Sequence, residues 1–297
     1  MQRKLKKTWE RNVVGYLFLS PWLIGFICLS AIPILASLYF SFTNYDMFSS
    51  PEWAGLANYK TMFMDEKWRN SLKVTLIYVF LGVPLQLMFA LAIALLLNRG
   101  IRGLRFYRAI YYVPSLFGGS VAVALLWRQL FGGEGLVNQM LAQMGIEGHN
   151  WIASPDTALY TLIILKVWQF GAPMVIFLAA LKQVPMELYE ASKIDGAGKW
   201  KQFSRITLPL ITPIVFFNLV MQTIQAFQAF TPAYIVSKGT GGPLDATLFY
   251  TLYLYQKGFT HFQMGYAASM AWFLLVVIAF VTALLFLSSK KWVYYQE

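Results

Sequence analysis

Residues 188–213 read LYEASKIDGAGKWKQFSRITLPLITP, a charged stretch in a chain of 297 residues that is 58% hydrophobic and only 12% charged. Long apolar runs precede and follow it, and it contains six charged side chains: Glu190, Lys193, Asp195, Lys199, Lys201 and Arg205. Charged side chains are costly within the hydrocarbon core of a membrane. We therefore interpret the stretch as a polar segment on one face of a membrane, held between two membrane-spanning segments.

Apolar blocks make up most of the remaining sequence. No Asp, Glu, Lys or Arg occurs in residues 12–45, 74–98, 109–127, 206–237 or 258–289, and Lys166 is the single charge in residues 157–181. Each block is long enough to cross a bilayer, which takes roughly 20 residues of helix. The sequence therefore predicts an all-α integral membrane protein with six transmembrane helices, whose membrane domain covers residues 12–290.

The distribution of basic residues predicts the orientation of these helices. Lysine and arginine cluster in residues 3–11, 99–108, 182–205 and 290–291, whereas the intervening loops balance them with Asp and Glu. The positive-inside rule then places both termini and the charged stretch in the cytoplasm. Residues 1–11 form a cytoplasmic basic segment, and residues 291–297 form a cytoplasmic tail. The formal net charge of +11 is a consequence of topology, so nucleic acid is not expected as a partner.

Sequence motifs of catalysis are missing. Gly198-Lys199 resembles part of a phosphate-binding loop, but Trp200 stands where Ser or Thr should bind magnesium, and Lys193 replaces the first glycine. No Gly-x-Ser-x-Gly sequence occurs, and the apolar blocks hold no acidic residue for a proton relay. We expect a chain that is not an enzyme and holds no cofactor of its own.

Neither a metal site nor a disulfide is expected. Cys28 is the sole cysteine and lies in the first apolar block, so no intrachain disulfide can form. His149 and His261 fall in different external loops without ligand-spaced neighbours. Lys166 lies deep in a span, and two interpretations of it remain open: a contact with a solute path, or a lysine near a water-filled cleft or an interface.

Helical periodicity predicts a two-helix hairpin at about residues 185–207. Pro185 suits the first turn of a helix, Asp195-Gly196 suits its end, and a second short helix is expected from about Lys199, leading into the fifth span near Pro209. Each arm carries a narrow apolar stripe: Leu188, Ala191 and Ile194 on the first, and Trp200, Phe203 and Ile206 on the second. Such stripes fit a groove on a second protein. The alternative is a solvated loop whose charges only enforce topology.

The same stretch carries a resemblance to a known family. Glu190-Ala191-Ser192, followed by Gly196 and by Ile206-x-Leu208-Pro209, resembles the Glu-Ala-Ala coupling motif of inner-membrane permeases of binding-protein-dependent ABC importers. Ser192 departs from the motif, which usually has a second Ala. Further matches resemble the maltose-type carbohydrate permeases: Asp195, Ala197, Phe203 and Pro213 in this stretch, with Phe42-Thr43, Gly55-Leu56-x-Asn58-Tyr59, Pro232-Ala233-Tyr234 and Gly241-Gly242-Pro243 elsewhere.

The resemblance implies a function and a set of partners. It implies a permease subunit of an ABC importer for a sugar or oligosaccharide, located in a bacterial or archaeal cell membrane. In this family the hairpin inserts into a cleft of a cytoplasmic ATPase dimer, which holds the ATP and Mg. A second permease subunit and an external solute-binding protein are also implied. The implied ATPase-coupling residues are Glu190, Ala191, Ser192, Asp195, Gly196, Ala197, Phe203, Ile206, Leu208 and Pro209.

A row of amides in the fifth span predicts a solute path. Asn218, Gln222, Gln225 and Gln228 lie on one helical face, where their amides match sugar hydroxyls. Phe227, Phe230 and Tyr234 could supply apolar surface for sugar rings. The alternative is hydrogen bonding between helices, worth about 0.6 kcal/mol per contact.

Two alternative functions remain open at this point. One is an ABC permease for another polar solute, such as a glycerol phosphodiester. The other is a stand-alone secondary transporter or channel subunit, which should show acidic residues or a basic voltage-sensing helix within the membrane. Neither feature occurs in the apolar blocks.

Overall fold

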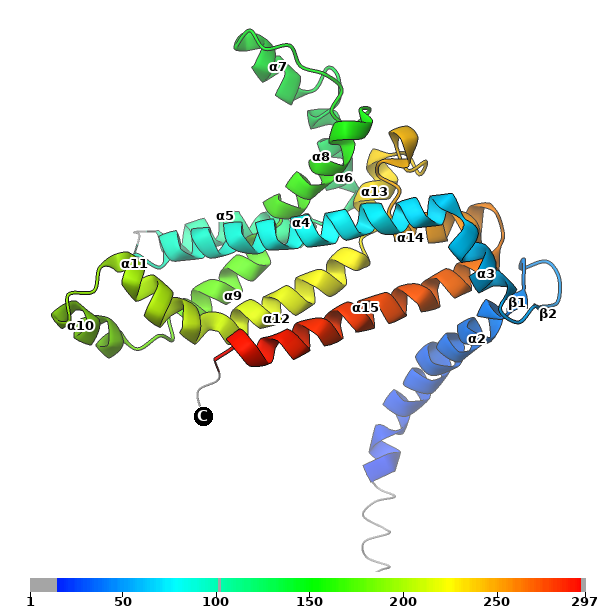
Figure 1. The fold of residues 1–297 in the computed structure, drawn as a ribbon, viewed down its shortest axis with the longest axis horizontal. Coiled ribbons are helices and arrows are strands. Elements are labelled where there is room, and N and C mark those ends of the chain that lie inside the picture. The colour runs from blue at the N-terminus through cyan, green and yellow to red at the C-terminus, as the bar shows by residue number, and fades with distance from the viewer. Residues whose placement is uncertain (1–14, 101–102, 295–297) are drawn as a thin grey trace, which may run out of the picture. The chain divides into compact units, whose positions relative to one another are not determined.

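The computed structural model describes residues 15–100 and 103–294; the basic segment 1–11 and the last residues of the tail lie outside the described residues. The described chain is helical almost throughout, which confirms the all-α membrane fold (Figure 1). Among the described residues, four helices are long and apolar enough to cross a membrane: Gly15–Ser41, Glu66–Leu97, Lys199–Phe227 and Met264–Trp292. Two bent helix pairs raise the number to six if each pair is one span.

The chain divides into two compact units, and the first comprises residues 1–64 and 257–274. Its described elements are η1 (Ile27–Ala31), α2 (Ile32–Ser41), β1 (Thr43–Asn44), β2 (Glu52–Trp53), α3 (Ala57–Met64), most of η4 (Gln256–Thr260) and the start of α15 (Met264–Trp292). The strands β1 and β2 pair antiparallel. The buried Asn58 amide donates to the carbonyl oxygens of Ser41 and Thr43, at 3.0 and 2.9 Å, where α2 ends and its last carbonyls lack helical partners.

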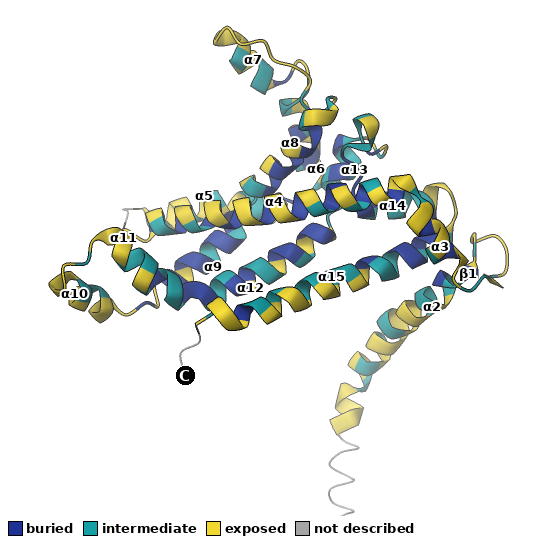
Figure 2. Ribbon diagram, viewed as in Figure 1, coloured by how far each residue is buried: buried dark blue, intermediate teal, exposed yellow. Residues whose placement is uncertain are grey.

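The second unit comprises residues 65–256 and 275–297, and α4 (Glu66–Leu97) organises it. Among the described residues, α4 packs against α8 (Pro155–Trp168), α9 (Gly171–Leu181), α12 (Leu208–Phe227) and α14 (Tyr250–Tyr255). The contact face of α4 follows helical spacing, with Val79, Val83 and Ala90 fully buried, and Figure 2 shows buried stretches recurring between exposed ones along the helix. The helix continues through Pro84, as spanning helices tolerate.

The remaining elements of the second unit are shorter. They are α5 (Leu104–Phe117), α6 (Val121–Leu130), α7 (Leu136–Gln143), α10 (Met186–Ile194), α11 (Lys199–Gln202), η2 (Phe203–Thr207), α13 (Thr231–Val236) and η3 (Pro243–Asp245). The third apolar block, residues 109–127, is not one straight helix: α5 and α6 meet at 99° across Gly118 and Gly119. The hydroxyl of Ser120 caps the new helix by accepting a hydrogen bond from the Val123 N–H. The block between 157 and 181 is also bent, by 40°, where α8 meets α9.

Candidate functional site

The turn of the hairpin has the geometry expected of a glycine-terminated helix. Helix α10 ends at Ile194, and Gly196 has a φ of 72°, a left-handed conformation that only glycine adopts without cost. The Ala197 N–H donates to the Ser192 carbonyl at 2.9 Å, and the Gly196 N–H donates to the Lys193 carbonyl at 3.0 Å. These bonds satisfy carbonyl groups that the end of α10 leaves without helical partners.

The second arm is part of the fifth spanning helix. The sequence favours a separate short helix from about Lys199, but α11, η2 and α12 form one continuous helix, Lys199–Phe227. The wide turn η2 lies directly before Pro209, whose ring would clash with the carbonyl four residues earlier in a regular helix. A displacement of the second arm is therefore carried into α12 without an intervening loop.

Side chains tie the two arms together. The Gln202 side-chain amide donates to the Ser192 hydroxyl at 2.9 Å, and the Tyr189 and Thr207 hydroxyls share a hydrogen bond of 2.8 Å. Ser192 is the residue that departs from the Glu-Ala-Ala pattern, and its hydroxyl supplies the acceptor for this contact. Tyr189 and Gln202 were not among the predicted coupling residues, because neither lies on an apolar stripe.

The first apolar stripe of the hairpin faces outward, and so does Trp200 at the start of the second stripe. Ile194 is 89% exposed and Trp200 is 78% exposed, and the Trp200 ring lies 5.6 Å from that of Phe203. Of the predicted coupling residues, Glu190, Ala191, Asp195 and Gly196 are exposed, whereas Ser192, Ala197, Phe203, Ile206, Leu208 and Pro209 are half-buried. Large apolar side chains this exposed on a charged helix pair suit a protein-docking surface.

A polar cavity of about 310 Å³ lies elsewhere in the second unit, where three helices are interrupted. Its lining includes Gly118 and Gly119 from the α5–α6 bend, Gln169 from the α8–α9 bend, and the segment between α12 and α13. Interrupted helices within a membrane occur where the freed backbone groups face protein or a water-filled cavity. In transporters, such interruptions mark solute sites.

Gln169 holds two of these interruptions in place. Its carbonyl, freed where α8 ends, accepts hydrogen bonds from the Gln86 amide at 3.0 Å and the Ser115 hydroxyl at 2.9 Å. Its own side-chain amide donates to the Gly118 carbonyl at 2.8 Å. A Cβ atom on Gly118 would lie 2.5 Å from the Gln169 side chain, so the contact requires glycine.

The structure brings the three predicted glutamines of the solute path, and Phe230, to this cavity. Gln222, Gln225 and Gln228 line it. Asn218, Phe227 and Tyr234 lie outside the lining: Asn218 is buried and donates to the Ile214 carbonyl, Phe227 is buried, and Tyr234 stacks on Phe230 at 5.2 Å. The cavity is also lined by polar side chains that were not predicted, namely Tyr78, Gln86, Ser115 and Gln169. The available signal for two of them was a glutamine inside an otherwise apolar block: Gln86 in residues 74–98 and Gln169 in residues 157–181.

Lys166 lines the same cavity and is 6% exposed. Its ammonium nitrogen lies 5.9 Å from the centre of the Tyr78 ring. An isolated charge at this depth costs on the order of 2.5–3.5 kcal/mol unless it is paired or hydrated. Placement in a polar cavity reduces this cost and argues against snorkelling to an interface, and both a contact with a solute path and a lysine near a water-filled cleft fit this position.

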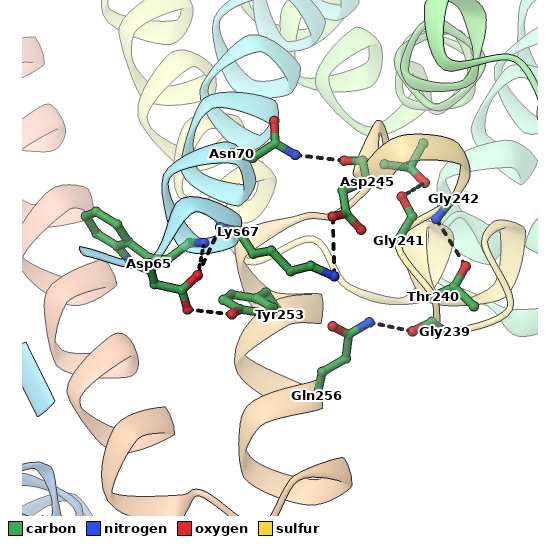
Figure 3. A network of polar contacts seen from close by, with 12 residues as sticks. Asp65, Lys67, Asn70, Gly239, Thr240, Gly241, Gly242, Asp245, Tyr253 and Gln256 are labelled. Atoms are coloured by element: carbon green, nitrogen blue, oxygen red, sulfur yellow. Dashed lines mark hydrogen bonds and ion pairs between the residues drawn. The ribbon is translucent and has the colours of Figure 1, made fainter. Parts of the chain in front are cut away.

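An ordered loop follows α13, and Figure 3 shows the polar contacts that hold it. Lys67 and Asn70 from α4 reach the loop at Asp245, through an ion pair of 3.5 Å and a hydrogen bond of 3.0 Å to its carbonyl. The Tyr253 hydroxyl donates to Asp65 at 2.5 Å. Burial, together with the Asp65 carboxylate, raises the pKa of Tyr253, so the phenol stays protonated as the donor. The contacts at Asp245 thereby hold the neighbouring Gly241-Gly242-Pro243 segment in a defined position.

Comparisons with known proteins agree with this geometry. Residues 53–294 match the family described as binding-protein-dependent transport system inner membrane component. The chain is 54% identical over 297 residues to "Probable ABC transporter permease protein YesP" of Bacillus subtilis (strain 168), covering 99% of this chain and 96% of that protein. It is 30% identical over 293 residues to the lactose transport system permease protein LacF of Rhizobium radiobacter, covering 97% of each.

A solved structure has the same fold. It is a bacterial alginate ABC transporter in complex with an alginate pentasaccharide-bound periplasmic protein, and one of its chains superposes with a TM-score of 0.79 at 22% identity. The match covers 97% of this chain and 98% of that one.

Proposed function

This chain belongs to the binding-protein-dependent transport system inner membrane components, and on that premise we propose that it takes up a sugar or oligosaccharide as one permease subunit of an ABC importer. It lies in the cell membrane of a bacterium or archaeon, with its helices in contact with lipid. It is a transport subunit and not an enzyme. The lactose permease LacF, similar over nearly its full length, supports the sugar assignment.

The observation that carries this proposal is the outward-facing hairpin on a continuous helix. Its exposed Ile194 and Trp200 offer apolar surface to a partner, and its second arm continues into α12, whose far end lines the polar cavity. We assign the partner as a cytoplasmic ATPase dimer that holds the ATP and Mg. Movement of that dimer then shifts α12 and changes which side of the membrane the cavity opens to.

The polar cavity supplies the chemistry that a sugar requires. The amides of Gln222, Gln225 and Gln228 each offer both donors and an acceptor, which match hydroxyl groups. The ring of Phe230 adds an apolar surface at the cavity wall.

The remaining partners follow from the same assignment. A second permease subunit completes the membrane pathway, and an external solute-binding protein delivers the sugar. The fixed loop around Gly241 and Asp245 offers this protein a preorganised surface. A stand-alone secondary transporter is set aside, since this family works with a binding protein.

Reconstitution tests the proposal. The permease pair, the ATPase dimer and the binding protein are placed in liposomes, and ATP hydrolysis and uptake are measured with a panel of oligosaccharides. We expect at least one sugar to stimulate hydrolysis and to accumulate only when ATP is present. Hydrolysis that no sugar changes, or uptake that does not need ATP, would show that the assignment is wrong.

A further inference from the structure

Lys166 is a buried cation without a carboxylate partner. Within residues 15–100 and 103–294, the structure gives it neither an ion pair nor a hydrogen bond, and its contact is with the face of the Tyr78 ring. It is 6% exposed, and it lines the polar cavity. No carboxylate occurs among the residues that line this cavity, so its wall carries a positive charge without internal compensation.

Gln86 contributes a second unsatisfied group to the same cavity. Its amide nitrogen is used in the hydrogen bond to the Gln169 carbonyl, whereas its side-chain oxygen is buried and has no partner among the described residues. Gln86 is 3% exposed. A buried acceptor of this kind is unfavourable until a ligand or water donates to it. The cavity wall thus holds a cation and, on Gln86, a buried acceptor without a partner.

The face of α4 is shaped around the lysine. Tyr78, Gly82 and Gln86 recur at four-residue spacing, which places them in one row along the helix. A Cβ atom on Gly82 would lie 3.2 Å from the Lys166 Cδ atom, so the glycine makes room for the lysine stem. The row therefore offers an aromatic face, a gap for the stem and an acceptor, in that order.

A neutral sugar does not require a buried cation in the cavity wall. Amides alone satisfy hydroxyl groups, and an uncompensated cation would lose hydration on binding a neutral solute without gaining a counter-charge. We propose that the solute is an anionic sugar whose carboxylate or phosphate group binds Lys166 while a hydroxyl group donates to Gln86. This inference rests on the proposed function and narrows its substrate class.

Direct binding to the purified complex tests the inference without the selectivity of the binding protein. The permease pair and ATPase dimer are held in nanodiscs, and ligand-observed saturation-transfer NMR gives Kd values. The ligands are matched pairs, each a uronate oligosaccharide and its carboxyl-reduced neutral counterpart, in the gluco, galacto and manno series. Hexose 6-phosphates form a separate arm that distinguishes phosphate from carboxylate as the anion.

We expect the anionic member of at least one pair, or a hexose phosphate, to bind about tenfold or more tightly than its neutral counterpart, as hydrogen bonds to charged groups allow. Lys166→Gln should reduce this ratio to about one, while neutral binding persists and reports an intact cavity. Lys166→Arg keeps the charge and should retain most of the preference. The preference should also fall as salt is added.

Equal affinity for both members of every pair, with neutral sugars bound, would overturn the inference and leave the proposed function standing. A preference that survives Lys166→Gln would also overturn it. If a carboxylate of the sister subunit pairs with Lys166, both members of every pair should bind equally, and the Lys166→Gln complex should be obtained in lower yield. Binding of no sugar of any kind would instead remove the proposed function, and the inference with it.

Discussion

The turn at Gly196 allows the coupling role of the hairpin to be tested by backbone strain alone. Gly196 has a φ of 72°, and a Cβ atom added there would meet nothing within 4 Å. A substitution therefore adds no clash, and its cost comes from the left-handed backbone, which is roughly 1–2 kcal/mol for an ordinary L-residue. Asn tolerates this region better than Ala, and β-branched Val tolerates it worst.

Two residues further along, Gly198 provides a matched control. It also has open space around a built Cβ, but its φ is −70° and its ψ is 165°, an extended conformation that suits valine. The series Gly196→Asn, Gly196→Ala and Gly196→Val should thus weaken the hairpin in that order, while Gly198→Val should have little effect. A cost of about 1–2 kcal/mol corresponds to a factor of roughly 5–30 in an equilibrium.

The assay is co-purification of the complex with titrated ATPase subunit, together with solute-stimulated ATP hydrolysis in liposomes. We expect Gly196→Val to weaken ATPase association by roughly 5–30-fold and to reduce stimulation, with unchanged amounts of the chain in the membrane. Wild-type association and stimulation in Gly196→Val would refute the reasoning. Equal damage from Gly198→Val would also refute it, because strain at the left-handed residue would then not be the cause.

Three further predictions address the arms, the cavity and the topology. Ser192→Ala removes the hydroxyl that joins the two arms and should cost about 1 kcal/mol, seen as a few-fold weaker association with the ATPase; unchanged association would exclude this contact from coupling. Gln225→Ala should change the half-saturation or the sugar preference of uptake while the complex still assembles. Asn218 lies outside the cavity, so Asn218→Ala should lower the thermal stability of the complex and leave the sugar preference unchanged. The reverse pattern would exclude this amide face from the solute path. Cysteines at Lys60 and Lys199 should react with membrane-impermeant reagents from opposite sides, and labelling from one side only would contradict the topology.

The hairpin was largely predictable from the sequence because its signals are local. Glycine after Asp195 and the spacing of Leu188, Ala191 and Ile194 depend on neighbours within one or two helical turns. The sequence indicated that the second arm leads into the fifth span, but it did not indicate that the two form one helix without a break. Pro209 suggested a helix start, but the wide turn at Phe203–Thr207 absorbs it within one helix.

The cavity was predictable only in part, because the residues that line it come from segments far apart in the sequence. Helical spacing placed Gln222, Gln225 and Gln228 on one face, but the partners of this face could not be deduced from spacing. The 99° bend was hidden inside a uniformly apolar block, although Gly118-Gly119 followed by a capping Ser120 was a usable signal. Hydropathy reports that a segment lies in a membrane, and it does not report whether the helix is straight.

We propose that nucleotide bound to a partner subunit controls access to the cavity through the hairpin. Gln225 lines the cavity and is exposed, so Gln225→Cys in a Cys28→Ser background places a single thiol there. The measurement is the rate of labelling by a membrane-impermeant maleimide from the external side of liposomes holding the complex, with and without trapped ATP. We predict that the rate changes severalfold with nucleotide and that Gly196→Val abolishes the change. A rate that is the same in both nucleotide states would contradict the account.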